Sequence, residues 1–406
     1  MIERDVVILG AGPAGLSAAA ELARLGVGKV TVIDREQTAG GIPRHCGHLG
    51  FGFREFRRVM TGPQYAATLA ETASQVEVKL GVTALRLEAG GVLQTMTPTG
   101  PETLRGHAVL LAMGARETPR SARLVSGTRP WGVMNTGALQ QYVYLHGKRP
   151  FERPAIIGTE LVAFSSLMTL RHLEIAPVAM VEAGGRITAR APGDWIARLV
   201  FGVPVLLDTR LVRILGSEKV EAIEIDRGFG AERLDCDGVV FTGRFRPESA
   251  LLGGSHLAVD PGTGGPAIDQ FWRCSDPAFF AAGNLLRGIE TAGQCFREGR
   301  AAARAIAAEL EGKLPPTGMG VPVQAEGALS YVYPQRIARD EPLDRELLFL
   351  ARARKAAKGR LILKADDTVI WTHRISALPE RRIAWPVSTR LLQGASRVTV
   401  ALEERA

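Results

Sequence analysis

The segment MIERDVVILGAGPAGLSAAAELARLGVGKVTVID at the start of the sequence constrains the fold more than any other part of this chain. An apolar, β-branched run, Val6–Leu9, leads directly into the glycine pattern Gly10-x-Gly12-x-x-Gly15. An Ala- and Leu-rich segment typical of a helix follows, and then a second apolar run that ends at Asp34. Glycines at this spacing, between a strand and a helix and followed by such an acid, indicate a βαβ unit that binds a dinucleotide.

Each glycine of this pattern has its own physical role. Gly10 permits a tight turn, Gly12 lets the backbone approach a pyrophosphate, and Gly15 lets the helix pack closely on the strand. The N-terminus of the helix offers free N–H groups and the positive end of its dipole to the phosphates. Asp34 is placed to accept the ribose hydroxyls, and Arg35 to contact either the adenine or solvent. The predicted site therefore comprises Gly10, Ala11, Gly12, Pro13, Ala14, Gly15, Asp34 and Arg35.

Length and charge narrow the class of protein. A chain of 406 residues is long enough for two to three domains, each with its own core. The net charge is +8, but the basic residues are dispersed without a long run. We therefore expect no nucleic-acid binding and interpret the densest basic patches, Phe53–Arg58 and Ala351–Arg360, as solvated surface or partner-docking sites.

The apolar segments and the cysteines predict a cytoplasmic protein. The first strand begins within a few residues of Met1, which predicts no signal peptide, and no uncharged apolar stretch approaches ~20 residues. The four cysteines lie far apart and form no CxxC, as expected of free thiols in a reducing compartment. This spacing also predicts no metal site and no iron–sulfur cluster on this chain.

A second βαβ pattern begins at Pro154. The predicted strand Ala155–Ile157, helix Glu160–Arg171 and strand Val178–Val181 repeat the layout of the N-terminus, and Glu182 stands in the position of the acid. The glycines do not repeat, because Glu160 occupies the position at which the backbone must approach the pyrophosphate. Its bulk and charge would repel a diphosphate. We expect NADH and NADPH to bind weakly or not at all. Glu160 can also cap its own helix, and the two roles are compatible.

Four ordered motifs resemble the two-dinucleotide-domain flavoproteins of the glutathione-reductase class. They are the N-terminal glycine pattern, the pair Gly40–Gly41, the segment Ala112-Met113-Gly114, and the turn Ala282-Gly283-Asn284 heading a long Ala-rich helix from Ala292. The resemblance implies FAD as cofactor and adds Gly41, Ile42, Ala112, Gly114, Gly283, Asn284, Thr291 and Ala292 to its predicted contacts. Asn284 replaces the acid usual in the class.

The resemblance also implies an α/β fold with two Rossmann-like domains. The FAD-binding domain is predicted from residues 1–118 and 243–314, with an NAD(P)-binding-like domain inserted at 119–242. Beyond a Pro- and Gly-containing linker, Leu314–Gln324, apolar and polar residues alternate with period two, which predicts a small antiparallel β module over 325–406. The run Glu346–Gly359 is compatible with a helix or a strand.

The loop GGIPRHCGHLGFG, from Gly40 to Gly52, lacks the paired cysteines of a redox-active disulfide. It resembles the FAD subunits of hydrogen cyanide synthase, opine oxidase and hydroxyproline dehydrogenase, and those that accompany anaerobic glycerol-3-phosphate dehydrogenase-like proteins. The resemblance implies a partner flavoprotein dehydrogenase subunit, and a small [2Fe–2S] protein or segment that holds any cluster.

The same loop carries the candidate catalytic residues His45, Cys46 and His48, which the resemblance places near the reactive face of the flavin. A histidine there can shuttle a proton to a flavin nitrogen, and a cysteine can tune the flavin or react. Alternatively, Cys46 is a buried packing residue and the histidines bond only to the backbone.

Three functions remain open at this point. The first is the FAD subunit of a heteromeric dehydrogenase or oxidase acting on an amino acid, a hydroxy acid or a glycerol-3-phosphate-like substrate. The second is a stand-alone NAD(P)H:acceptor oxidoreductase. The third is a scaffold subunit in which FAD is structural. The tail is expected to act in assembly rather than in FAD binding.

Overall fold

The computed structural model describes residues 1–288, 290–316, 320–339 and 346–404, and it divides them into two compact units. The first unit comprises residues 1–41, 66–115 and 246–406, and the second comprises 42–65 and 116–245. The first therefore combines the regions predicted as FAD-binding domain and C-terminal module. The second joins the predicted inserted domain to the loop that carries His45, Cys46 and His48. Residues 317–319 of the predicted linker lie outside the described part of the chain.

The N-terminal βαβ unit forms as predicted from the alternation of apolar strands with an Ala-rich helix. Strand β1 (Ile2–Leu9) and strand β2 (Val30–Asp34) pair in parallel and are joined by helix α1 (Pro13–Arg24). Their sheet has the order β5-β2-β1-β8-β7-β6, and β20 also pairs with β8. The remaining strands of this sheet are β5 (Glu77–Leu80), β6 (Thr83–Glu88), β7 (Val92–Thr97), β8 (Gly100–Leu111) and β20 (Phe279–Ala281).

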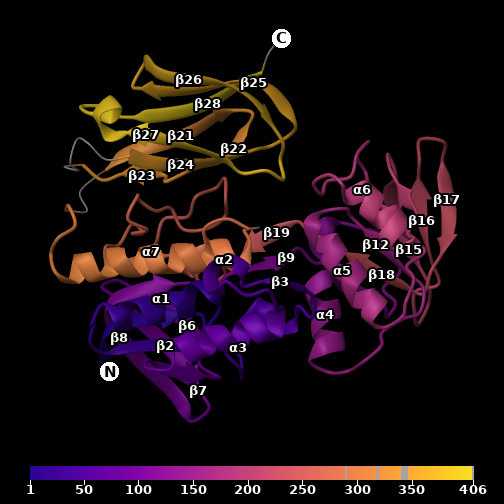
Figure 1. The fold of residues 1–406 in the computed structure, drawn as a ribbon, viewed down its shortest axis with the longest axis horizontal. Coiled ribbons are helices and arrows are strands. Elements are labelled where there is room, and N and C mark those ends of the chain that lie inside the picture. Colours follow the sequence, from indigo (N-terminus) through magenta and orange to yellow (C-terminus); the bar gives the residue numbers. More distant parts are fainter. Residues whose placement is uncertain (289, 317–319, 340–345, 405–406) are drawn as a thin grey trace. The chain divides into compact units, whose positions relative to one another are not determined.

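Helix α7 (Ala292–Leu310) packs along α1, as Figure 1 shows. The two helices approach closely because Gly299 has no side chain: a Cβ there would lie 2.0 Å from the Ala14 carbonyl oxygen. Ser17 Oγ of α1 donates to the carbonyl of Phe296 across the same contact (2.9 Å). The packing places the start of α7, although distant in sequence, in the same unit as the glycine turn.

The C-terminal module is built of strands in two sheets, of orders β23-β21-β28-β25-β26 and β22-β24-β27. The ambiguous run from Glu346 is strand in the structure, and the pair Asp366–Asp367 forms the hairpin turn between β25 and β26. The pairing is antiparallel except between β21 and β28, which are parallel. The bounds are β21 (Val321–Gly327), β22 (Leu329–Tyr333), β23 (Arg336–Ile337), β24 (Glu346–Ala353), β25 (Ala357–Ala365), β26 (Thr368–Ala377), β27 (Ile383–Ser388) and β28 (Val398–Glu404), with a short helix η6 (Thr389–Leu392).

The C-terminal module shares an apolar core with the rest of the first unit. Its Tyr333 and Leu350 are buried in the same apolar cluster as Val7, Phe279 and Leu285 of the dinucleotide-binding fold. A second cluster, centred on residues such as Phe349 and Leu361, lies within the module itself. Burial of apolar surface therefore joins the module to the fold that carries the glycine turn.

The second unit repeats the parallel architecture with the strand order β11-β18-β12-β13-β14, and a four-stranded sheet, β10-β15-β16-β17, accompanies it. Its predicted βαβ forms as strand β12, helix α5 and strand β13. The sequence reasoning did not identify β15 or β17, whose residues are largely exposed. The elements are η1 (Ile42–His45), β3 (Leu49–Phe51), α2 (Phe53–Phe56), β4 (Met60–Thr61), η2 (Arg120–Arg123), β10 (Ser126–Gly127), β11 (Val133–Asn135), α4 (Thr136–Tyr144), β12 (Pro154–Ile157), α5 (Leu161–His172), β13 (Ala179–Val181), α6 (Gly193–Trp195), η3 (Ile196–Val200), β14 (Val205–Leu206), β15 (Arg210–Leu215), β16 (Ala222–Asp226), β17 (Ala231–Asp235) and β18 (Gly238–Phe241).

The chain passes between the units within helix α3 (Gly62–Thr72) and near the short strands β9 (Ala115–Glu117) and β19 (Phe245–Pro247). Two further short helices, η4 (Leu252–Gly254) and η5 (Gly283–Leu285), lie in the first unit. In the described part of the chain, no helix is both long and apolar enough to cross a membrane.

Candidate functional site

The glycine turn of the first unit has the tight geometry that its spacing predicts. Gly10 has φ +114°, and a Cβ on it would lie 2.5 Å from the Ala112 carbonyl oxygen. A Cβ on Gly15 would lie 1.8 Å from the Gly10 carbonyl oxygen. The turn therefore admits no side chain at either position, and it brings Ala112 at the end of β8 against the loop.

The N-terminus of α1 is left open for an anion. Its N-cap is Gly12, which offers no side-chain acceptor, and Pro13 stands in the first turn. A Cβ added to Gly12 would meet one atom within 4 Å, the Gly41 Cα at 3.9 Å. Gly41 itself has φ +63° and faces Gly12 so closely that a Cβ there would lie 2.9 Å from the Gly12 Cα. Two glycine loops thus meet over a bare helix N-terminus, which fits a pyrophosphate.

Asp34 lies at the end of β2, where a ribose acid is expected. Its Oδ2 accepts the Ala11 N–H at 2.6 Å and its Oδ1 accepts the Glu36 N–H at 2.8 Å. These bonds fix the carboxylate beside the glycine loop. The neighbouring Arg35 is exposed.

The second backbone turn forms at Gly283, after β20. Gly283 has φ +76°, and a Cβ on it would lie 2.9 Å from the Ala14 Cβ of α1. Its N–H donates to the carboxylate of Glu298 on α7 (3.2 Å). Gly114 also has a positive φ of +75°, and its carbonyl accepts the Glu248 N–H at 2.9 Å. The predicted residues Ala14, Ala112 and Gly283 therefore come together, from three separate stretches of sequence.

Asn284 is oriented by its own loop. Its side chain accepts the Glu290 N–H at 2.7 Å and donates to the Glu290 carbonyl at 3.2 Å. Both bonds close the turn that leads into α7. Thr291 caps that helix by accepting the Gln294 N–H, and Ala292 is its first residue.

Glu21 clamps α1 to α7, a contact that the sequence did not reveal. Its carboxylate is 2% exposed and pairs with Arg24 (2.9 Å), Arg300 (2.8 Å) and Arg304 (2.7 Å). Hydrogen bonds from these guanidinium groups, chiefly that of Arg24, lower the pKa of Glu21 to about 2 against the opposing effect of burial. The clamp holds together the two helices whose N-termini line the predicted site.

In the second unit, Glu160 fills the place of the missing glycine. Its Oε2 accepts the Thr242 hydroxyl at 2.6 Å. A Cβ on Gly158 would lie 2.5 Å from that oxygen, and a Cβ on Gly243 would lie 2.4 Å from Oε1. The carboxylate thus lies over the glycines at the carboxyl ends of β12 and β18, the edge at which parallel sheets bind nucleotides. Glu160 is the N-cap residue of α5, as the capping interpretation requires, although its side chain makes no cap hydrogen bond.

Glu182, at the position of a ribose acid in this second βαβ, is likewise occupied within the protein. It accepts hydroxyl hydrogen bonds from Thr159 and from Thr188 (3.2 Å), and its other oxygen accepts the Gly184 N–H at 3.0 Å. Both acids of the second unit therefore have partners within the chain. The Glu160 carboxylate is what does not fit a nicotinamide nucleotide, since the ribose acid of the first unit, Asp34, is also hydrogen-bonded within the chain.

The predicted catalytic loop belongs to the second unit, as does Ile42 at its start. Cys46 is buried, and its thiol contacts Gln140 Oε1 (3.4 Å) and the Ile42 carbonyl (3.5 Å). Burial, with the negative charge of Glu117, raises the pKa of Cys46 to about 12. A thiol that stays protonated at neutral pH is a poor nucleophile, which favours the packing interpretation.

The two histidines of this loop differ in their surroundings. His45 is buried, at 4% exposure. His48 Nδ1 lies 2.9 Å from the Leu49 carbonyl, so it carries the proton, and Nε2 accepts from Ser165 Oγ at 3.1 Å. Nδ1 thus bonds to the backbone, whereas Nε2 bonds to a side chain, and the role of His48 as a proton shuttle stays a prediction.

Glu117 is a buried acid that the sequence reasoning did not single out. It is 6% exposed, and Oε2 accepts the Gly137 N–H at 2.8 Å. Burial raises its pKa to about 7, outweighing the lowering by that hydrogen bond, the Thr136 hydroxyl and Arg123. The one feature of the sequence that points to Glu117 is its position three residues after Gly114, which follows an apolar strand. A carboxyl that titrates near neutral pH is suited to proton transfer.

The four cysteines are free and buried in the structure. Among the described residues, no group of three or more His, Cys, Asp or Glu side chains is arranged to hold a metal ion.

Comparison with known proteins decides the family. The family model of pyridine nucleotide-disulphide oxidoreductases matches residues 4–299. The chain belongs to this family. Its members bind FAD, and related enzymes also bind NAD(P), so the chain is an FAD-dependent oxidoreductase. The two-dinucleotide-domain class expected from the four motifs is confirmed.

Curated relatives include both components of oxidases and stand-alone enzymes. The chain is 28% identical to the alpha subunit of sarcosine oxidase from Rhizobium meliloti, over 79% of this chain and 32% of that protein. It is 25% identical to a subunit of opine oxidase from Agrobacterium tumefaciens, over 76% of this chain and 66% of that protein. It is 27% identical to dihydrolipoyl dehydrogenase of Bacillus subtilis, over 89% of this chain and 82% of that protein. This oxidoreductase thus spans about a third of the first relative.

Solved structures share the fold. Thioredoxin reductase of T. acidophilum superposes with a TM-score of 0.65 at 22% identity, over 76% of this chain and 99% of that one. L-proline dehydrogenase of P. horikoshii has a TM-score of 0.59 at 19% identity, over 78% of this chain and 57% of that one. Both support two Rossmann-like domains for this oxidoreductase.

Proposed function

We propose that this oxidoreductase is the FAD-binding subunit of a heteromeric dehydrogenase or oxidase. A partner flavoprotein would oxidise an amino acid, a hydroxy acid or a glycerol-3-phosphate-like substrate, and this chain would receive or relay the electrons. Flavin suits the role because it exchanges one or two electrons. The complex would work in the cytoplasm, where its buried thiols stay reduced.

The observation that carries the proposal is the contrast between the two nucleotide folds. In the first unit, Gly12 and Gly41 leave the N-terminus of α1 bare for a pyrophosphate. In the second, the Glu160 carboxylate fills the corresponding space. A protein that holds FAD but excludes NAD(P)H must obtain its electrons from another donor, which favours a partner subunit.

Residues of the first unit would hold FAD. The open N–H groups at the start of α1 would bind the pyrophosphate, Asp34 the adenosine ribose, and the Gly283 turn with Thr291 and Ala292 would approach the remaining chain of the cofactor. We retain His45 as a candidate for proton transfer and add Glu117, since burial raises its pKa to about 7.

Two relatives support the subunit role by their names, the alpha subunit of sarcosine oxidase and the subunit of opine oxidase. If an iron–sulfur cluster takes part, we place it on the partner, because the four cysteines of this chain are dispersed and buried. The similarity to dihydrolipoyl dehydrogenase, which extends over 89% of this chain, favours the stand-alone NAD(P)H oxidoreductase as the second candidate.

Anaerobic stopped-flow spectroscopy separates these functions. The chain is purified from its native host with whatever accompanies it, and bleaching of the flavin is followed after mixing with NADH or with candidate substrates. We expect no fast bleaching by NADH, and bleaching by substrate only when the co-purified partner is present. Rapid reduction of the isolated chain by NADH would establish the second candidate instead. A chain that no donor reduces would indicate a structural flavin.

A further inference from the structure

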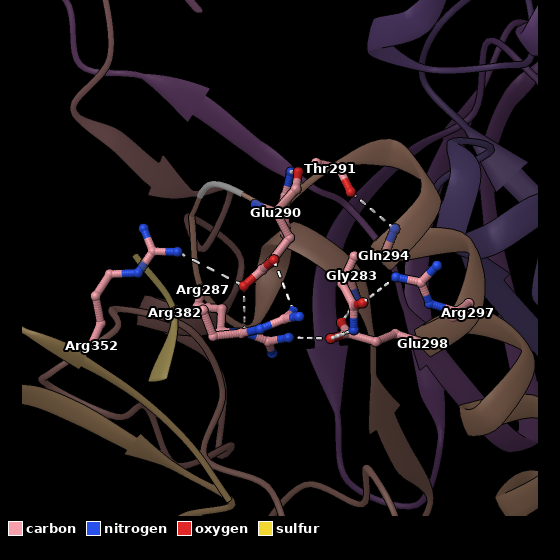
Figure 2. Close-up of polar contacts among 10 residues, drawn as sticks. Gly283, Arg287, Glu290, Thr291, Gln294, Arg297, Glu298, Arg352 and Arg382 are labelled. Atoms are coloured by element: carbon pink, nitrogen blue, oxygen red, sulfur yellow. Dashed lines mark hydrogen bonds and ion pairs between the residues drawn. The ribbon is translucent and has the colours of Figure 1, made fainter. Parts of the chain in front are cut away.

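A cluster of charged side chains lies immediately before helix α7. The Glu290 carboxylate, 9% exposed, contacts three guanidinium groups: Arg382 Nη1 at 3.1 Å, Arg287 Nε at 3.5 Å and Arg352 Nη2 at 3.8 Å. Figure 2 shows these arginines converging on the one carboxylate. One nearly buried acid is thus held by three cations.

The arginines come from different parts of the first unit. Arg287 follows the Gly283 turn, whereas Arg352 lies in β24 and Arg382 just before β27, both in the C-terminal module. Arg287 is 1% exposed, pairs with Glu298 of α7, and lies 4.9 Å from the centre of the Tyr333 ring. The cluster therefore joins the module to the turn that precedes α7.

The same cluster fixes the backbone of that turn at both ends. Glu298 receives the Gly283 N–H (3.2 Å) while it pairs with Arg287. At the other end, the backbone of Glu290 is bonded twice to the Asn284 side chain, and Thr291 begins the helix by capping it. The position of the Glu290 carboxylate is thus tied directly to the backbone at Gly283, Asn284 and Thr291.

We propose that Glu290 is a positioning residue for the flavin site, and that Arg382 and Arg352 of the module orient the cofactor-binding turn through it. The inference rests on the proposed FAD role of Gly283, Thr291 and Ala292. It assigns the C-terminal module to the flavin site, in addition to any part that it plays in assembly. It also revises the expectation that residues 325–406 are dispensable for FAD binding.

Arg382 is the residue to test, because its side chain is 33% exposed and its replacement leaves little unfilled volume. Arg382→Gln removes the closest charge on Glu290, and Arg382→Lys restores it. Arg397→Gln is the matched control, since Arg397 belongs to the same module and pairs with an exposed acid, Asp367, at 3.4 Å. FAD is removed from each full-length protein, and its dissociation constant is measured by fluorescence quenching on reconstitution. The visible circular dichroism of the bound flavin and its midpoint potential are recorded as well.

We expect Arg382→Gln to weaken FAD binding about tenfold, because Glu290 loses its closest cation within a coupled network of charges, and to change the visible circular dichroism. Arg382→Lys should stay within about threefold of the wild type, and Arg397→Gln should match the wild type. In combination with Glu290→Gln, Arg382→Gln should add less than its separate effect, because both changes break one contact.

The outcomes separate the inference from the function on which it rests. If the wild-type chain does not bind FAD, the proposed function fails. If it binds FAD and Arg382→Gln changes neither affinity nor spectrum, the positioning role is wrong while the function stands. A lower melting temperature with unchanged FAD parameters likewise reduces the contact to a structural one and overturns the inference. Strictly additive effects of the two substitutions would also contradict it.

Discussion

Replacing Glu160 tests whether one carboxylate keeps nicotinamide nucleotides out of the second unit. Its oxygens lie within 2.5 Å of the places that Cβ atoms on Gly158 and Gly243 would take, so it fills the glycine-lined edge of the sheet. A diphosphate brought to that edge would meet a negative charge at about 4 Å. Two unit charges at that distance repel by about 4 kcal/mol at an effective dielectric constant of about 20, which corresponds to almost three orders of magnitude in Kd.

The expected gain on substitution is a fraction of this figure, because Glu182 is bonded to Thr159 and Thr188 and would still have to exchange these partners for a ribose. Glu160→Gln removes the charge but keeps the bulk, and we expect it to strengthen NADH binding about tenfold. Glu160→Gly removes both and should strengthen it about a hundredfold. Loss of the Thr242 contact should cost about 1 kcal/mol of stability in Glu160→Gly, whereas the amide oxygen of Gln in Glu160→Gln can still accept the Thr242 hydroxyl.

Isothermal titration calorimetry with NADH measures these affinities directly. The control is Asp194→Asn, which removes an exposed carboxylate of the same unit, paired with Arg198 at 2.8 Å. The wild type and this control should bind NADH only at about millimolar concentrations or not at all. Micromolar affinity in the wild type would refute the reasoning. Unchanged affinity in Glu160→Gly would show that some other feature excludes the nucleotide.

The remaining predictions concern the cofactor and the buried acids. Gly12→Glu should abolish FAD binding, since the side chain would occupy the open N-terminus of α1; a variant that still carries stoichiometric flavin absorbance would contradict the assignment. The purified chain should contain no iron–sulfur cluster, which iron and acid-labile sulfide analysis will check. Burial raises the folded-state pKa of Glu117 from 4.5 to about 7, so the folded state binds the extra proton between these values. Stability should therefore fall by up to about 1.4 kcal/mol per pH unit from pH 4.5 to 7, and Glu117→Gln should remove that slope in urea unfolding. The pKa of Glu21 is instead lowered to about 2, so its contribution is present above pH 4.5 and lost towards pH 2; Glu21→Gln should melt earlier at pH 7 but not at pH 2.

The sequence alone determined the parts of this protein that depend on local backbone chemistry. The turn at Gly10 and Gly15 has no room for a Cβ, so only glycine fits there and the spacing of the glycines predicts the turn. The helix after it and the alternating strands of the tail follow from the periodicity of their apolar residues. The presence of Glu160 in place of a glycine could also be predicted from the sequence, because it follows from aligning the second βαβ pattern with the glycine spacing of the first.

Only the tertiary structure decided which distant side chains meet. Glu21 reads as an ordinary helix residue, and its role as a clamp appears only when α7 brings Arg300 and Arg304 against it. Apart from its position after Gly114, nothing in the sequence distinguishes Glu117 from the other acidic residues, because its raised pKa results from burial in the folded protein. The sequence of the tail indicated strands but no site, because Arg382 acquires its partner Glu290 only when the module packs on the rest of the first unit. Pairing and desolvation depend on contacts between residues far apart in the chain, and no local pattern records them.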